Sequence, residues 1–232
     1  MSEVRNSTCA LRRVALLLAL GWVLVVTSSV PAHAASFQNG DFDSGMLEPW
    51  TDFTTPLGSI GASGEAQVVL FDTNNDGFNS FAVQLQVGQL ISLGLDQEGG
   101  GIEQTFSLAN GNLSISLDIA SNNSGNSDNG SGGIFQLLFD DVVLDTVDFG
   151  VIGGRQTEFG TLSGAVPTIV AGTHTLTILV TRPFLRSDST PLQYIDNVVL
   201  TGSAIPEPKT AALLAVGLLA LAVLRSRQRV RA

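Results

Sequence analysis

The sequence predicts an all-β fold, an antiparallel β-sandwich, between two apolar terminal segments. Short runs rich in Val, Ile, Leu, Thr and Phe alternate with clusters of Gly, Asn, Asp and Ser, a pattern typical of strands joined by turns. Turn signals recur about every 8 to 12 residues, the spacing expected in a sandwich or barrel. No long amphipathic helical pattern interrupts residues 36–204. We therefore expect one β-domain there.

Strict alternation marks the clearest strands. In residues 112–119 the leucines and isoleucines share one face, and the serines and the aspartate share the other. Residues 174–181 repeat the pattern, whereas residues 134–140 are apolar on both faces, which fits a doubly covered strand or a buried helix. Residues 121–133 contain no apolar side chain and are expected to be an exposed, mobile loop. Further strands, giving about nine or ten in all, are expected at residues 66–71, 80–87, 102–108, 142–149, 156–162 and 192–200.

The N-terminal segment, residues 1–34, has the layout of a secretory signal peptide. Arginines at positions 5, 12 and 13 accompany the start of a largely apolar run over residues 10–30, and small residues follow it. The Ala32-x-Ala34 spacing suits signal peptidase, so cleavage is expected after Ala34. A retained membrane anchor is the alternative. Against it, the run ends in Pro31 and small residues rather than in a positively charged flank.

Residues 36–204 form a strongly acidic segment of 169 residues, enough for one domain with its own core. They contain three Lys and Arg against 19 Asp and Glu, a formal charge of −16. Such a charge repels nucleic acid and anionic lipid and attracts cations. The only cysteine, Cys9, precedes the expected cleavage site. Stability must then come from the core, from bound metal or from both.

The C-terminal segment, residues 205–232, combines three features in order. Pro206, Glu207 and Pro208 precede an apolar run of 15 residues at 210–224. At about 1.5 Å per residue this run reaches roughly 22 Å as a helix, a marginal membrane span. An amphipathic surface helix is disfavoured because no polar stripe interrupts the run. A basic cluster, expected to stay cytoplasmic, follows: Arg225, Arg227, Arg229 and Arg231.

These three parts resemble the PEP-CTERM sorting signals that exosortases of Gram-negative bacteria recognise and cut. The two prolines flanking Glu207 hold the segment extended, as a transpeptidase site needs. The resemblance implies processing by signal peptidase and exosortase, an inner-membrane intermediate, and then the cell surface or extracellular matrix. The implied partner there is exopolysaccharide, as in a biofilm. A simple tail anchor is the alternative.

Both edges of the acidic domain resemble galactose-binding-like jelly rolls, the fold of many carbohydrate-binding modules. Residues 38–45, QNGDFDSG, with Trp50 after them, resemble the opening strand of that family. Residues 194–200, YIDNVVL, resemble its closing strand. The resemblance covers roughly 20 residues, since the middle of the domain agrees only in pattern. It implies a jelly roll whose first and last strands lie side by side and share a structural calcium ion.

Carried over to this sequence, the resemblance places Asp43 and Asp196 at the calcium site, with Asp41 as an extra acid nearby. Asp43 stands where the family has glutamate, so its carboxylate reaches one methylene less far. The acids also suit calcium chemically, because calcium prefers several oxygen ligands. Alternatively, they are turn and capping residues on a solvated edge.

A second candidate calcium loop contains Asp72, Asn74 and Asp76, followed by Gly77, the first half of the pattern D-x-[DN]-x-[DN]-G. Its second half fails, since Val83 stands where an EF-hand needs glutamate. The alternative is an Asn/Asp/Gly hairpin turn between two strands.

Catalytic signals are sparse in residues 36–204. His174 is the only histidine there, no cysteine is present, and no Gly-x-Ser-x-Gly elbow occurs. Asp140 and Asp141 would point to opposite faces of a strand, so they do not form a glycosidase pair. Trp50 is expected in the core, which leaves Tyr194 as the one other large polar aromatic.

The sequence therefore favours a non-catalytic binding or matrix module associated with extracellular polysaccharide. A structural surface protein without a small ligand and a glycan hydrolase are the alternatives.

Overall fold

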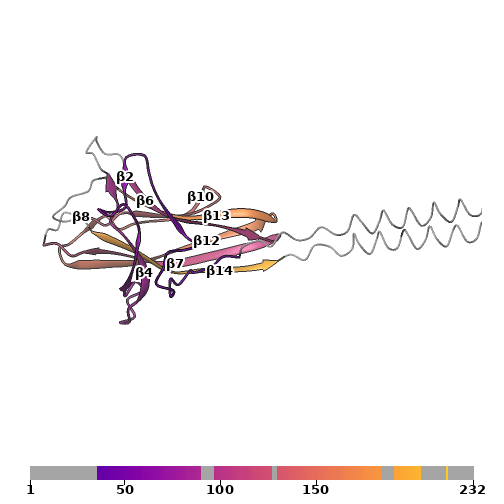
Figure 1. Cartoon of the computed structure of the whole chain (residues 1–232), viewed down its shortest axis with the longest axis horizontal. Helices are drawn as coiled ribbons and strands as arrows, with labels where there is room; N and C mark the ends of the chain where they lie inside the picture. The colour runs from indigo at the N-terminus through magenta and orange to yellow at the C-terminus, as the bar shows by residue number, and fades with distance from the viewer. Residues whose placement is uncertain (1–35, 90–96, 127–129, 184–190, 205–217, 219–232) are drawn as a thin grey trace, which may run out of the picture. The chain divides into compact units, whose positions relative to one another are not determined.

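Two five-stranded antiparallel sheets pack face to face (Figure 1). The computed structural model describes residues 36–89, 97–126, 130–183 and 191–204, together with residue 218. All of these belong to one unit of the chain, Ala35–Ala232. The predicted all-β antiparallel sandwich is confirmed. The expected signal peptide and sorting segment lie outside the described residues, and no helix among the described residues is long and apolar enough to cross a membrane.

The first sheet has the strand order β1-β6-β13-β9-β10 and the second has the order β12-β7-β14-β4-β3. The first consists of β1 (Thr51–Thr54), β6 (Glu98–Leu108), β13 (Gly172–Arg182), β9 (Ile134–Phe139) and β10 (Val142–Asp148). The second consists of β12 (Gln156–Ile169), β7 (Gly111–Asn123), β14 (Leu192–Ala204), β4 (Ser80–Leu85) and β3 (Gln67–Phe71). Two short pairs complete the described strands: β2 (Gly58–Ser59) with β5 (Gly88–Gln89), and β8 (Gly130–Ser131) with β11 (Val151–Ile152).

The core lies between the two sheets and is built from the alternating apolar positions. The leucines and isoleucines of β7, from Leu113 to Ile119, are at most 4 % exposed, and Leu176, Ile178 and Val180 of β13 are fully buried in the other sheet. Trp50 is 2 % exposed, as predicted, and its Nε1 donates a hydrogen bond to the Asn39 carbonyl oxygen at 2.9 Å. Burying each large apolar side chain contributes about 1.5–3 kcal/mol, so this layer is the main source of stability.

β6 begins four residues before the predicted strand, in a run of glycines. A β-carbon at Gly101 would lie 1.9 Å from the Ile178 carbonyl oxygen, and one at Gly99 would lie 2.1 Å from that of Val180. Glycine therefore fits here because the backbone of β13 approaches β6 too closely for a side chain. From residue propensity alone, the same run of glycines predicts a turn.

The structure corrects the expected exposed loop of residues 121–133 at both of its ends, where residues 121–123 belong to β7 and residues 130–131 form β8, whereas Ser124 and Asn126 are exposed as expected. Ser121 and Asn123 belong to β7 and are fully buried. The Ser121 hydroxyl donates to the Gly132 carbonyl oxygen at 2.8 Å, and the Asn123 amide donates to that of Ile152 at 3.1 Å. Polar side chains are tolerated inside because backbone acceptors satisfy them.

The opening segment lies beside the last strand, although it is not itself a strand. The Val198 amide donates to the Gly40 carbonyl oxygen at 2.8 Å, which ties residue 40 to β14. On its other side, the Gln38 amide donates to Gln104 Oε1 of β6 at 2.9 Å. The domain's two edges thus meet, as the jelly-roll resemblance implies.

Candidate functional site

The second sheet presents a polar and aromatic surface on the side that faces away from the first sheet; we name this side the outer face. Because side chains alternate along a strand, the residues between the buried leucines and isoleucines of β7 point outward. Ser114 and Ser116 are exposed there, while Ala120 of the same face is buried by its neighbours.

Strand register arranges the outer face in rows that cross β12, β7 and β14. One row aligns Ser163, Ser116 and Val199, and the next aligns Thr161, Asp118 and Asp196. The row beyond aligns Phe159, Ala120 and Tyr194. Hydroxyls, carboxylates and aromatic rings therefore follow one another along the strands within three neighbouring rows.

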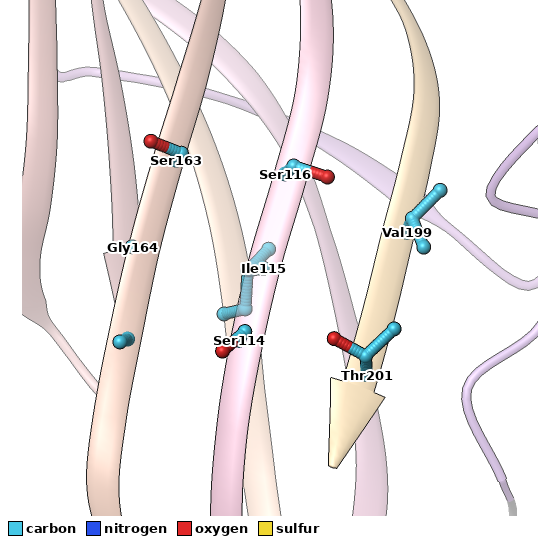
Figure 2. Close-up of a pocket in the computed structure, with 8 residues that line it drawn as sticks. Ser114, Ile115, Ser116, Ser163, Gly164, Val199 and Thr201 are labelled. Carbon is cyan, nitrogen blue, oxygen red and sulfur yellow. The ribbon is translucent and has the colours of Figure 1, made fainter.

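An open hollow of about 470 Å³ lies at the hydroxyl-rich end of the outer face. Ser114, Ser116, Ser163 and Thr201 line it, and Figure 2 shows them on three adjacent strands. Each hydroxyl both donates and accepts hydrogen bonds, so the hollow suits a ligand that is itself rich in hydroxyls.

An aromatic strip made of Phe71, Tyr194 and Phe159 borders the polar rows. The rings of Phe71 and Tyr194 stack with their centroids 3.6 Å apart and their planes at 4°. Tyr194 is 5 % exposed and packs with Ala82 and Ala120 in a hydrophobic cluster separate from the core. This burial raises the pKa of the Tyr194 hydroxyl. Phe159 stays 37 % exposed, so the strip offers ring surface to solvent.

Asp196 is a buried carboxylate at the centre of the outer face. Its oxygens accept hydrogen bonds from the Ser80 hydroxyl at 2.5 Å and from the Asn197 amide at 2.6 Å. Burial raises its pKa to about 6; the two hydrogen bonds oppose this shift, and the negative charges of Asp118 and Asp43 add to it. The neighbouring Asp118 accepts from the Asn197 side chain at 2.9 Å.

The predicted metal residues are brought together in part. Asp43 lies near enough to Asp196 for its charge to raise the pKa of that carboxyl. Asp41 instead accepts a hydrogen bond from the Asp43 amide at 3.3 Å, as a turn residue does. Within the described ranges, no group of three His, Cys, Asp or Glu side chains is arranged to hold a metal ion. Asp118 was missed, although alternation in residues 112–119 places it on the outer face.

The second predicted loop forms the hairpin turn between β3 and β4. The two carboxylate oxygens of Asp72 accept from the amides of Asp76 and Gly77 at 3.1 and 3.0 Å. The Asn74 side chain donates to Asp76 at 3.2 Å, and Asp76 also accepts from the Phe78 amide at 2.8 Å. These side chains stabilise the turn itself, which is the alternative that the sequence left open.

Asp140 and Asp141 are not strand neighbours, contrary to the sequence argument. They form the β9–β10 turn with φ angles of 48° and 63°, in the left-handed region that aspartate tolerates. Asp140 accepts from His174 Nδ1 at 2.7 Å and from the Thr175 amide at 2.9 Å. The turn is thereby fastened to β13.

His174 faces acceptors at both ring nitrogens, because its Nε2 lies 2.9 Å from the Val170 carbonyl oxygen. Only the imidazolium can donate to both partners. Burial lowers the pKa of His174, but the bonds to Asp140 and Val170 outweigh it and raise the pKa above 6.5. For Asp140, burial raises the pKa, while the bonds from His174 and Thr175 outweigh it and lower the pKa below 3.8.

The pair formed by His174 and Asp140 predicts a pH dependence of stability. Because the folded pKa of His174 is raised, its stabilisation is complete below about pH 6.5 and is lost as pH rises through the folded pKa. Thermal unfolding from about pH 5 to about pH 9 measures the loss. His174→Gln should remove this part of the slope, and Asp148→Asn, on β10, is the control. Equal slopes for wild type and His174→Gln would contradict the prediction.

Comparisons with known proteins show structures of similar fold and no matching family. No family model and no curated protein sequence matches the chain. A solved structure of TmCBM61 in complex with beta-1,4-galactotriose aligns at 14 % identity and a TM-score of 0.45, covering 72 % of this chain and 97 % of that one. The CBM22-1 xylan-binding domain of Paenibacillus barcinonensis Xyn10C aligns at 11 % identity and a TM-score of 0.39, covering 72 % and 93 %.

A third similar structure is the enzymatically active domain of bacteriophage CBA120 tailspike protein 4, at 16 % identity and a TM-score of 0.42. It covers 73 % of this chain and 21 % of that one. These scores are too low to assign the chain to a family or to transfer a ligand or an activity to it. The site has to be interpreted from its own residues.

Proposed function

We propose that this chain is an exported, exosortase-sorted surface protein whose sandwich is a non-catalytic module that associates with extracellular polysaccharide. The observation that carries the proposal is the outer face, where the exposed ring of Phe159 and the stacked rings of Phe71 and Tyr194 border rows of hydroxyl and carboxylate groups.

The chemistry of this face matches that of a sugar chain. A pyranose has an apolar C–H face that packs against an aromatic ring, and a rim of hydroxyls that exchange hydrogen bonds with serine, threonine and carboxylate groups. The exposed ring of Phe159 supplies the first kind of contact. Thr161, one row from it, and Ser163 and Ser116, two rows from it, supply the second.

An open face suits a polymer better than a small molecule. The hollow is bordered by strand residues and stays open to solvent, so a chain can lie across it without an end having to enter. Charge also limits the class of polysaccharide. Asp118 and Asp196 make the centre of the outer face acidic, which disfavours polyanionic glycans unless a cation lies between them and the face. A neutral polysaccharide fits best.

The proposed route to the surface rests on the sequence. The signal-peptide layout, the motif around Glu207, the apolar run and the arginine cluster occur in the order that sorting requires. The proposed location is therefore the inner membrane of a Gram-negative bacterium, transiently, and then the cell surface or matrix.

A glycan array probed with the full-length chain in detergent tests the proposal. Binding to neutral polysaccharides, with no release of reducing ends, is the expected result. Silence across the array would contradict the proposal and select a purely structural surface protein. Release of reducing ends would contradict it in favour of a glycan hydrolase.

Calcium is a further part of the proposal, with Asp43 and Asp196 as the residues that would hold it. Its support is the electrostatic proximity of Asp43, Asp118 and Asp196, and the formal charge of −16 on residues 36–204. Asp41 accepts a hydrogen bond from the Asp43 amide, and a complete ligand set is not present among the described side chains. A bound cation would relieve the repulsion that raises the pKa of Asp196.

Calcium is expected to raise the melting temperature by about 5–10 °C. Binding only the folded state contributes about 2.7 kcal/mol when calcium is a hundredfold above its Kd, and each kcal/mol shifts the midpoint by about 2–4 °C. Thermal unfolding in calcium and in chelator measures the effect. Asp196→Asn should abolish it, whereas Asp72→Asn in the hairpin should not. One melting temperature in both conditions would remove calcium from the proposal.

A further inference from the structure

One end of the sandwich combines four chain segments and no charge. It contains residues 36–37, the β6–β7 hairpin at 108–111, the β12–β13 hairpin at 169–172 and the end of β14 at 200–204; we name it the uncharged pole. The segments meet because Gly111 pairs with both Ile169 and Ala204, and Gly172 pairs with Leu108. The arrowhead of β14 marks this end in Figure 1.

The absence of charge extends well back along the strands. Residues 36–40, 104–117, 159–173 and 197–204 contain no Asp, Glu, Lys or Arg. They are 42 of the domain's 169 residues, and a random placement of its 22 charged side chains would put about five there. On β7, the first acid is Asp118, seven residues from Gly111, or about 23 Å along the strand.

The acids of the β9–β10 turn are set back from the pole. Asp140 and Asp141 form the β9–β10 turn, and Asp140 binds the Thr175 amide and His174. Thr175 lies three residues inside Gly172, about 10 Å from the start of β13. The pole itself therefore contains no Asp, Glu, Lys or Arg, and the nearest titratable ring is that of His174, whose Nε2 lies 2.9 Å from the Val170 carbonyl oxygen.

The surface of the pole is also apolar. Val170 is 72 % exposed in the β12–β13 hairpin. Beside it lies a hollow of about 350 Å³, lined by Phe37, Leu108, Ile169 and Leu200 together with small and amide residues. An exposed, neutral and apolar end is unusual in a domain whose formal charge is −16.

The sequence that follows Ala204 limits how far the uncharged pole can lie from the apolar run. Five residues, 205–209, separate Ala204 from the apolar run at 210–224. Fully extended, five residues span at most about 18 Å. If the run is in the bilayer, as the proposed function requires, the uncharged pole is the part of the domain held next to the lipid headgroups.

Charge then decides whether the domain can approach. Acidic groups within a Debye length of about 8 Å from an anionic bilayer are repelled, whereas a neutral apolar surface is not. We propose that the uncharged pole is a membrane-facing surface that rests on anionic phospholipid while the chain is still anchored. This inference rests on the proposed sorting anchor. It limits the earlier expectation, drawn from the net charge of the domain, that anionic lipid repels the domain.

Fluorescence quenching in vesicles tests the inference with the full-length chain. In a Cys9→Ser background, Val170→Cys places a probe on the pole, and Val151→Cys places the matched probe on β11. Val151 is 68 % exposed. It lies at the opposite end of β7 from the pole, because the carbonyl oxygen of its neighbour Ile152 accepts a hydrogen bond from the Asn123 side chain. The vesicles contain phosphatidylethanolamine and phosphatidylglycerol with headgroup-labelled quencher lipid.

Loss of fluorescence from the Val170→Cys probe, with none from the Val151→Cys probe, is the expected result. Thr168→Glu, which adds an acid on β12 next to the pole, should reduce the quenching at Val170→Cys, and raised salt should restore it. Equal signals from both probes, on protein that floats with the vesicles, would overturn the inference and leave the sorting anchor intact. Protein that does not float with the vesicles would overturn both.

Discussion

Replacing Glu207 with alanine is expected to leave the C-terminal tail on the protein in a host that carries the exosortase. The wild-type protein should lose the residues beyond about Pro208, since the motif Pro206-Glu207-Pro208 is the proposed recognition sequence. Proline fixes its own φ and disfavours the helical region for the residue before it, so an extended backbone is expected at this motif, and the carboxylate between the prolines is the group proposed to be recognised. Removal of the tail should be nearly complete in the wild-type protein and nearly absent in Glu207→Ala.

Intact mass spectrometry of surface-extracted protein measures this result. Lys209→Gln, which leaves the motif unchanged, is the matched control and should be processed like the wild type. Finding Arg231 in the mature wild-type protein would show that no sorting cleavage occurs, and the chain would then be a simple tail-anchored protein.

Trp50→Ala should lower the free energy of unfolding by about 3–5 kcal/mol, the usual range for a buried large aromatic. Trp50 is 2 % exposed and meets the Phe37 ring edge to face at 5.6 Å. Its Nε1 bond to Asn39 also fastens the opening segment to the domain. Because a domain of this kind has about 5–15 kcal/mol of stability in total, the loss is a large fraction of it.

Denaturant unfolding of the full-length chain measures the loss. Phe78→Ala removes another ring, but Phe78 is 78 % exposed on the β3–β4 hairpin, so its effect should stay within about 0.5 kcal/mol. A small effect of Trp50→Ala, equal to that of Phe78→Ala, would contradict the position of Trp50 in the core.

Much of the strand pattern could be predicted because burial imposes alternation on the sequence. Leu113 to Ile119 and Leu176 to Val180 show it plainly, and both segments are inward-facing strands. Strands without that signal were missed or shortened. β12 continues seven residues past Leu162, through Gly164 and Pro167, which propensity assigns to turns.

The candidate site was harder to predict because its parts depend on register. The sequence identified Asp196 and Tyr194 singly, but Asp118 and Phe159 join them only through the pairing of β7 with β14 and with β12. Likewise, Asp140 and Asp141 resemble strand residues until the left-handed turn is seen. Long-range pairing is absent from local sequence, so the rows of the outer face had no sequence signal.

The most direct test of the central claim is a calorimetric titration with the polysaccharide that the array selects. Phe159→Ala should weaken binding about 2- to 10-fold, since an aromatic contact is worth about 0.5–1.5 kcal/mol beyond area burial. Phe78→Ala, which removes a more exposed ring from the β3–β4 hairpin, should bind like the wild type. If Phe159→Ala also binds like the wild type, the outer face is not where this protein holds a glycan.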